Sequence, residues 1–316
     1  MSQVEVYNKE MAEQRAQRDK DYAEYEAAGR IWGLVPRERI TKIKFPRVPK
    51  EIVDGFKALE DDLTGTVSDI LDALGVAEGR VVGSAGTSLD YLQQYVTDES
   101  ISNLGTIKEA DLEAVMACEP DVIFIGGRLS KSYDALSEIA PVVYLATDTE
   151  LGVVESVRRN AATIASMFGL EDKVDELMAD FDSRIQALAA FAEGKNAIVG
   201  MCTSGSFNVL GNDGRCSMIG REIGFENIGA AADIDTSTHG NEASFEFIVE
   251  KDPDYIFVMD RDAAIGTDGA QLAQEIMENE LVMGTDAYKN GHLVYLAHPA
   301  VWYTAEGGIT ALDLML

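Results

Sequence analysis

The sequence is poor in the residues that build most catalytic and metal centres. Its 316 residues include three cysteines and three histidines, and none has a partner at zinc-ligand spacing. Cys118, Cys202 and Cys216 are an odd number without a CxxC pair, so we expect free thiols, with Cys118 and Cys202 buried. Walker A, GxGxxG, GxSxG and HExxH motifs are absent. These absences argue against the common nucleotide-binding, hydrolytic and zinc-dependent enzymes.

Basic residues and long apolar runs are also scarce. Lysine and arginine number 26 against 55 acidic residues, which gives a formal net charge of -29. Such a surface repels nucleic acid and anionic lipid, so neither is an expected partner. No apolar run approaches the ~20 residues that span a membrane. The first 30 residues are charged throughout and are not a signal peptide.

What the sequence does contain is an internal repeat. The segment DLEAVMACEPDVIFIGGR ends at Arg128, and SFEFIVEKDPDYIFVMDR aligns with it without a gap and ends at Arg261. Each copy has the pattern of a short helix, a Pro-Asp turn and an apolar strand. The tetrapeptide VYLA follows each copy, at 143–146 and 294–297. We therefore predict two related α/β lobes, the second with an added helical excursion within 265–291.

The predicted organisation has four parts. They are a charged helical extension (1–47), an N-terminal α/β lobe (48–148), an interdomain helical connector (149–194) and a C-terminal α/β lobe (195–316). Strand-like segments alternate with helical ones in both lobes, which predicts Rossmann-like parallel or mixed sheets covered by helices. A ligand is then expected in a cleft between the lobes, beyond the carboxyl ends of the strands.

The connector has apolar residues at three-to-four spacing and no cluster of glycine and proline, so we expect long, rigid helices. Asp148 or Thr149 is the expected N-cap of the first helix, and Gly169 marks a break. The chain ends at LDLML, inside an apolar helical pattern, which predicts a final helix that is cut short.

The two matched arginines are the first candidates for a binding site. Arg128 and Arg261 follow their strands directly and would each present a positive charge to the cleft. The alternative is a structural ion pair, because Asp260 and Asp262 flank Arg261. Occurrence at matched positions in both repeats favours binding.

Four further candidates lie in the second lobe. Arg215 belongs to a glycine-rich turn before a helix, where a solvated arginine is the alternative. His239 lies in a polar loop, and loop histidines are commonly solvated. Trp302 and Tyr303 follow the last strand; they could cap the core, or the tyrosine could offer its oxygen to ferric iron.

Several of these motifs resemble one known family. THGNEASFEFIVEKDPDYIFVMDR, NELVMGTDAYKNGHLVYL, WYTAEGG and, in the first lobe, GRLSKSYDALSEIAP are similar to the class III substrate-binding proteins of ABC transporters. Within that class they resemble binders of ferric catecholate siderophores of the petrobactin and enterobactin type. The resemblance covers roughly residues 80–315. The family's apolar first strand is replaced here by EIVDGFKALEDDLTG, a poor strand sequence.

The resemblance implies roles for individual residues. Arg128, Arg215 and Arg261 match the family's basic floor for the anionic ligand, and Trp302 adjoins it. His239 and Tyr303 match the residues that complete iron coordination when a bis-catechol siderophore leaves two positions open. The iron arrives with the siderophore, so no intrinsic cofactor is expected.

The leading hypothesis is therefore an extracytoplasmic, monomeric protein that captures a ferric siderophore for an ABC permease, its export signal absent from this chain. Alternatives are a haem or corrinoid binder of the same fold, with His239 or Tyr303 as axial ligand, and an enzyme acting on a metal chelate. A Soret band after haem addition, or turnover of the ligand, would distinguish them.

Overall fold

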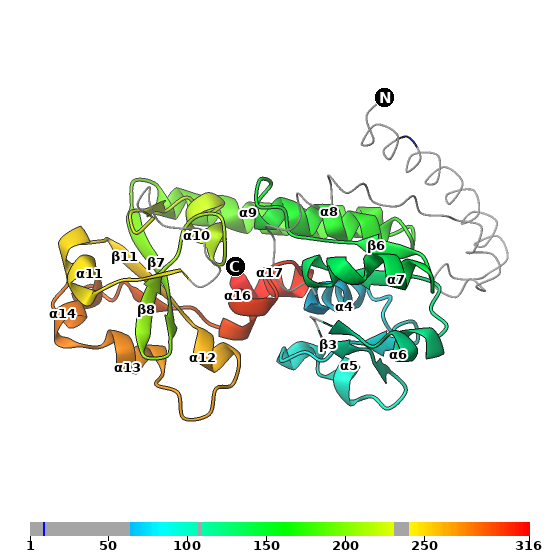
Figure 1. Ribbon diagram of the computed structural model, residues 1–316. Coiled ribbons are helices and arrows are strands. Elements are labelled where there is room, and N and C mark those ends of the chain that lie inside the picture. The colour runs from blue at the N-terminus through cyan, green and yellow to red at the C-terminus, as the bar shows by residue number, and fades with distance from the viewer. Residues whose placement is uncertain (1–8, 10–63, 107–108, 231–239) are drawn as a thin grey trace. The chain divides into compact units, whose positions relative to one another are not determined.

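The computed structural model describes residue 9 and residues 64–106, 109–230 and 240–316 (Figure 1). The predicted N-terminal extension, apart from Lys9, and the atypical first-strand segment lie outside the described residues, as does His239. The chain divides into two compact units. The first comprises Met1–Thr147 and Arg158–Asp175, and the second comprises Asp148–Val157 and Glu176–Leu316. The four predicted domain boundaries remain predictions.

The first unit contains short strands alternating with helices. β1 pairs in parallel with β2, β5 pairs in parallel with β6, and β3 and β4 form an antiparallel pair. Val115, Ile125, Leu136 and Val142 form a buried apolar cluster beside β5 and β6. The elements are α4 (Thr64–Ala73), β1 (Gly83–Ser84), η3 (Asp90–Leu92), α5 (Gln94–Thr97), β2 (Ser102–Asn103), β3 (Gly105–Thr106), β4 (Glu109–Ala110), α6 (Leu112–Ala117), β5 (Ile123–Ile125), η4 (Gly127–Ser132), α7 (Tyr133–Ser137) and β6 (Val142–Tyr144).

The second unit is built on a mixed sheet. Among the described residues its strand order is β10-β8-β7-β11-β12, and β9 pairs with the beginning of β7. β7, β11 and β12 are parallel, whereas β8 returns antiparallel from β7. The strands are β7 (Asn196–Thr203), β8 (Ser206–Val209), β9 (Glu226–Asn227), β10 (Asn241–Glu242), β11 (Tyr255–Asp260) and β12 (Leu293–Tyr295).

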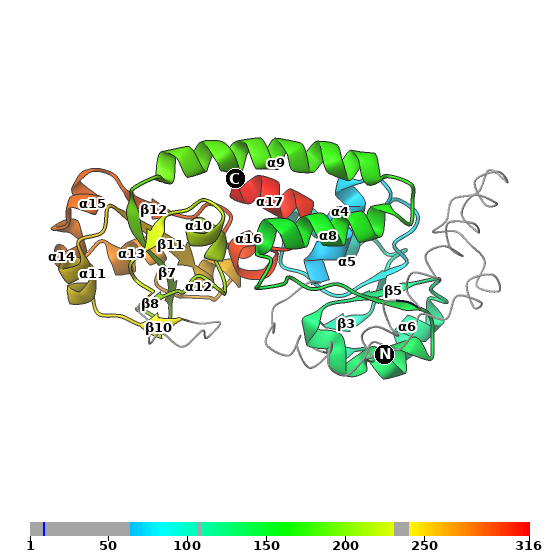
Figure 2. The same cartoon turned by 90° about the horizontal axis from the view of Figure 1, so that it is seen from above.

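Short helices surround this sheet, and both views show α11 beside α14 at one end of it (Figure 2). The core includes Ile198, Phe207, Ile256, Val258 and Met277, all buried. The predicted excursion within 265–291 contains α13, α14 and α15. The helices are α10 (Ser217–Arg221), α11 (Phe245–Lys251), α12 (Arg261–Ala264), α13 (Ala273–Met277), α14 (Glu280–Met283), α15 (Asp286–Lys289), α16 (Pro299–Thr304) and α17 (Ile309–Met315).

The connector is helical, as predicted, with α8 (Val153–Ala165) and α9 (Glu171–Ala192) separated near Gly169, whose φ is 66°. The predicted N-cap was wrong. The Asp148 carboxylate accepts the backbone N–H of Glu150 within the preceding turn, at 2.9 Å. The first N–H of α8, that of Val153, instead donates to Glu222 Oε1 at 2.7 Å. Because Glu222 lies 69 residues after Val153, no short sequence pattern indicates this cap.

The repeat seen in the sequence is also a structural repeat. α6 and α11 are each capped by the side chain of the preceding residue, Asp111 and Ser244. Just before the Pro-Asp turn, the chain takes a left-handed conformation at Glu119 (φ 48°) and at Asp252 (φ 44°). β5 and β11 then each pair in parallel with the strand that carries the VYLA echo. The predicted α/β class is confirmed, with one copy of this helix-turn-strand module in each unit.

Candidate ligand-binding site

Arg261 stands where β11 gives way to α12, at the carboxyl end of the parallel strands. Its Nε donates a hydrogen bond to the phenol oxygen of Tyr303 at 3.0 Å. Its guanidinium carbon lies 5.5 Å from the centre of the Tyr303 ring. One quarter of the Arg261 side chain is exposed. The arginine is therefore fixed at one edge and open to solvent at another.

A buried carboxylate holds a third edge of Arg261. Nη1 lies 3.3 Å from Asp262 Oδ1 and 3.3 Å from the Thr203 hydroxyl. Asp262 itself is 5% exposed, and its Oδ2 accepts the backbone N–H of Ser204 at 2.6 Å. Ser204 and Gly205 both have positive φ and form the tight turn between β7 and β8. The turn thus positions the carboxylate, and the carboxylate positions the arginine.

Arg215 approaches Tyr303 from a different segment. It precedes α10 in the glycine-rich turn and is 3% exposed. Its Nε donates to the backbone carbonyl of Tyr303 at 2.9 Å, and its guanidinium carbon lies 4.1 Å from the ring centre. That distance is typical of a cation–π contact. The Tyr303 ring is consequently in contact with two guanidinium groups.

A second bond joins the same two segments. The backbone N–H of Cys216, which has φ of 59°, donates to Glu306 Oε1 at 2.7 Å. Glu306 therefore stabilises a left-handed turn that a cysteine adopts only with strain. This contact fixes the turn that carries Arg215 against the loop that follows α16.

Trp302 and Tyr303 are neighbours in α16 but differ in how far they are exposed. The helix begins at Pro299, whose fixed φ suits the first helical position, after left-handed His298. Trp302 is 4% exposed and belongs to the core, whereas Tyr303 is only partly buried. Tyr303 can reach a ligand; a ligand contact by Trp302 stays a prediction.

The structure brings together three of the six predicted site residues: Arg215, Arg261 and Tyr303. Arg128 lies in η4, directly after β5, and its side chain is outside the described part of the chain, as is all of His239. The ion-pair alternative for Arg261 is also confirmed, because Asp262 contacts it. The ion pair uses Nη1, whereas Nε bonds Tyr303.

Sequence reasoning missed Thr203 and Glu306, which hold the cluster in place. Thr203 closes β7, and its proximity to β11 depends on strand pairing that the sequence does not state. Glu306 lies within the WYTAEGG motif, so the motif itself was the available signal. Neither residue has a local pattern that indicates its partner.

Two buried thiols adjoin this cluster. Burial, with smaller contributions from Asp260 and Asp262, raises the pKa of Cys202 to about 12. Burial also raises the pKa of Cys216 well above its ordinary value, an effect that Glu306 strengthens and Arg215 opposes. All three cysteines are free thiols, but Cys118 is partly exposed and not buried as predicted. It follows the last residue of α6, where its Sγ lies 3.7 Å from the Val82 carbonyl oxygen.

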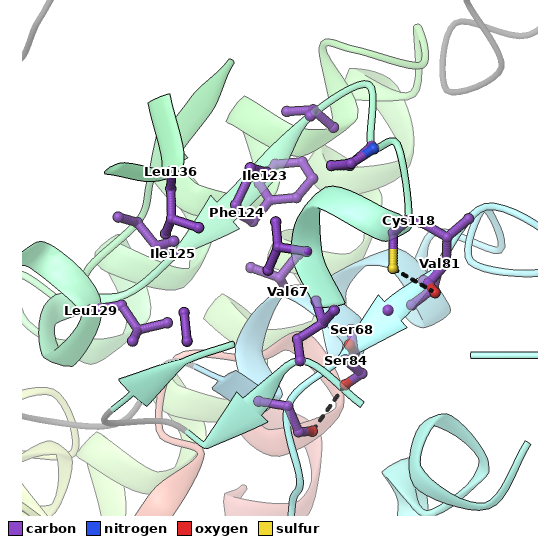
Figure 3. A pocket seen from close by; sticks show the side chains of 18 of the residues that line it. Val67, Ser68, Val81, Ser84, Cys118, Ile123, Phe124, Ile125, Leu129 and Leu136 are labelled. Carbon is purple, nitrogen blue, oxygen red and sulfur yellow. Dashed lines mark hydrogen bonds between the residues drawn. The ribbon is translucent and has the colours of Figure 1, made fainter. Parts of the chain in front are cut away.

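A separate cavity of about 200 Å³ lies within the first unit. It opens between β1 and β5, and its walls include Val67, Val81, Phe124 and Leu136 (Figure 3). The polar side chains of the lining are those of Ser68, Arg80, Ser84, Thr106 and Cys118. This lining is mostly apolar and holds no candidate from the sequence. One cationic side chain, that of Arg80, belongs to the lining, and its Nη1 donates to the Val76 carbonyl oxygen at 2.8 Å.

Across the described residues, no cluster of histidine, cysteine, aspartate or glutamate has the arrangement of a metal site. The helices in those same residues are too short or too polar to cross a bilayer. The arginine–tyrosine cluster is thus the chemically distinctive feature of the second unit. Its donors suit an anionic, oxygen-rich ligand.

Comparison with known proteins identifies the family of this chain. Residues 63–300 match the family model described as periplasmic binding protein. The chain belongs to this family. Its members are binding proteins by name, and the two-unit α/β architecture is the one expected of it.

Among curated relatives, the chain is 35% identical over 279 residues to the petrobactin-binding protein YclQ of Bacillus subtilis, which covers 86% of this chain and 82% of YclQ. The YclQ crystal structure matches with a TM-score of 0.71, over 81% of this chain and 87% of that one. The periplasmic catecholate-siderophore binding protein VctP of Vibrio cholerae matches at 30% identity and a TM-score of 0.72, over 81% and 89% of the two chains.

Proposed function

We propose that this protein captures an anionic ferric siderophore of the catecholate type and delivers it to an ABC importer. One observation carries the proposal: two arginines contact a single, partly exposed tyrosine, and one of them, Arg261, follows the carboxyl end of the parallel strand β11. The proteins most informative for the ligand, YclQ and VctP, are a petrobactin binder and a catecholate-siderophore binder by name. Both are at least 30% identical to this chain.

The donors of the cluster match the ligand's oxygens. A ferric catecholate presents deprotonated oxygens around the metal, and guanidinium groups form strong charge-assisted hydrogen bonds to such atoms. Arg215 and Arg261 already use their Nε atoms to bond Tyr303. Arg261 Nη2 is the group that would donate to the ligand, because Nη1 faces Asp262 and Thr203. Arg215 and Arg128 are proposed to add two further positive charges.

Tyr303 would act on the iron itself. The metal is cargo that arrives with the siderophore, and a bis-catechol complex leaves two of six coordination positions open. The Tyr303 phenol oxygen, already accepting from Arg261, is a hard oxygen donor of the kind that ferric iron prefers. His239 is proposed as the second protein ligand.

Delivery implies a location and a partner. As a member of the periplasmic binding protein family, this protein is proposed to work outside the cytoplasm and to pass its ligand to a membrane permease. It is proposed to act as a monomer and as a binding protein rather than an enzyme.

The test is a titration of the protein with ferric bis-catecholate and tris-catecholate complexes, in which binding is measured by tryptophan fluorescence. Trp302 adjoins Tyr303, so we expect quenching and micromolar or tighter binding. Arg261→Glu should abolish binding of both complexes. Tyr303→Phe should weaken the bis-catecholate complex more than the tris-catecholate one, because only the former leaves coordination positions for the protein.

The matched control is Lys289→Glu, the same reversal of charge on the exposed surface of α15. It should leave both affinities unchanged. If the protein bound neither complex but gave a Soret band with haem, the haem-binding alternative would replace this proposal. Equal losses for both complexes in Tyr303→Phe would argue against direct coordination of iron.

A further inference from the structure

Asp262 is an acidic residue inside a site that is proposed to bind an anion. Its side chain is 5% exposed and lies 3.3 Å from Arg261 Nη1. Both of its oxygens are engaged: Oδ2 accepts the backbone N–H of Ser204 at 2.6 Å, and Oδ1 faces the Thr203 hydroxyl and Arg261 Nη1. The bond to Ser204 needs only one oxygen, which a neutral amide would also supply, so that bond does not require the charge.

Two of the three nitrogens of the Arg261 guanidinium have hydrogen-bond acceptors within the protein. Nε bonds Tyr303, and Nη1 faces Thr203 and Asp262. Within the described part of the chain, Nη2 has no hydrogen-bond acceptor. A ligand on Nη2 is therefore close enough to Asp262 to experience its negative charge, since the separation is within the Debye length of about 8 Å.

The exposed acids among the described residues act differently. Asp268, for example, is exposed, and salt screens exposed charges from a ligand more than a Debye length away. Asp262 is shielded from solvent and contacts the binding arginine directly. Salt therefore screens its repulsion of a bound anion less than it screens that of an exposed acid.

We propose that Asp262 determines ligand selectivity by charge, lowering the affinity of the site for highly charged ferric complexes relative to weakly charged ones. The inference rests on the function proposed above. Coulomb repulsion grows in proportion to the ligand's charge, so the penalty on a trianionic tris-catecholate is about three times, on a logarithmic scale, that on a monoanionic bis-catecholate. Asp262 thereby favours complexes that have fewer catecholate groups and open iron positions.

Asp262→Asn tests this, because asparagine has nearly the same shape, keeps an oxygen acceptor for Ser204 and removes the charge. Its amide NH2 then faces the Thr203 hydroxyl, which can accept a hydrogen bond from it. We expect affinity to increase about threefold for the monoanionic complex and about thirtyfold for the trianionic one, in proportion to ligand charge. The measurement is a fluorescence titration of each complex at about 0.15 M salt, the ionic strength that gives the stated Debye length. Asp268→Asn, the same substitution at an exposed position, should change neither affinity.

Two results would overturn the inference. If Asp262→Asn weakens both complexes equally, the carboxylate serves to orient Arg261 and not to select by charge. If Asp262→Asn increases the affinity for both complexes by the same factor, the effect of Asp262 does not depend on the charge of the ligand. Absence of binding by the unsubstituted protein would instead refute the proposed function, so the two failures are distinguishable.

A second comparison is available if Asp262→Asn does not fold. Arg261→Gln leaves Asp262 as an uncompensated buried charge, whereas the double variant Arg261→Gln, Asp262→Asn removes both charges. The double variant should bind the trianionic complex more tightly than the single variant does. Equal affinity of the two variants would contradict the proposal.

Discussion

Burial controls the chemistry of the two thiols closest to the arginine–tyrosine cluster. Burial is the main cause of the raised pKa of Cys202, to about 12, and of the raised pKa of Cys216. A thiol with a pKa of about 12 is a thiolate in roughly one molecule in ten thousand at pH 8. Cys202 and Cys216 are therefore unreactive side chains of the folded core. Their reactivity towards an alkylating reagent indicates whether the second unit is folded.

The first prediction concerns these thiols and pH. An alkylating reagent at pH 8 should modify Cys118 and spare Cys202 and Cys216 until urea unfolds the protein. The pKa of Cys202 in the folded protein lies above the unfolded value of about 8.5. The contribution of the protonated Cys202 thiol to the free energy of unfolding is therefore complete below about pH 8.5. It is lost as pH rises towards about 12. The free energy of unfolding should therefore be lower at pH 10 than at pH 8.

Mass spectrometry of labelled peptides and urea unfolding at the two pH values measure these effects. Cys202→Ala is the control, since its free energy of unfolding should fall less between pH 8 and pH 10. Rapid labelling of Cys202 in the native protein would contradict the prediction.

At the scale of elements, the repeated module ends its helix in the same strained way in both units. Glu119 and Asp252 have φ of 48° and 44°, and each precedes a proline. Proline disfavours a helical conformation at the residue before it, so the helix ends there. Aspartate tolerates the left-handed region because its short side chain can bond locally, whereas glutamate has no such advantage.

The second prediction follows from that difference. Glu119→Gly should stabilise the first unit by about 0.5 to 1 kcal/mol, because the steric cost of about 1–2 kcal/mol that Glu119 bears exceeds the entropy that glycine gains when unfolded. Asp252→Gly should change stability little, since the smaller strain relieved there is offset by the entropy that glycine gains when unfolded. Both residues are exposed, so no packing is lost.

Urea unfolding of the two variants beside the unsubstituted protein checks this. Glu119→Ala serves as the matched control: alanine retains the β-carbon that causes the strain, so it should not stabilise. An equal gain from the alanine and glycine substitutions would show that backbone strain is not the cause.

The same elements show what the sequence could and could not predict. Periodicity and the Pro-Asp turns were enough for α6, α11, β5 and β11, because these signals are local. Arg261 and Tyr303 could be named from motifs, but not the hydrogen bond between them, which depends on how α12 packs against α16. The cap of α8 by Glu222 and the turn held by Glu306 likewise arise from tertiary contacts.

For the whole molecule, the dominant physical fact is a net charge of -29 in a protein proposed to bind an anion. Screening reconciles the two. At about 0.15 M salt the Debye length is about 8 Å, so an approaching ligand experiences only nearby charges. At about 0.01 M salt the Debye length is about 30 Å. At low salt the acids of the entire surface contribute repulsion.

The third prediction is that ferric catecholate associates more slowly at low salt than at physiological salt. This direction is opposite to that of most arginine-rich anion sites, where salt slows association by screening attraction. Here the long-range field is repulsive and only the short-range field is attractive. The dissociation rate should hardly change, because hydrogen bonds between the arginines and the ligand would be about 3 Å long, far shorter than either Debye length. Stopped-flow quenching of tryptophan fluorescence across a salt series separates the two rates. An association rate that falls steadily as salt rises would mean that the arginine cluster, and not the net charge, dominates the approach of the ligand.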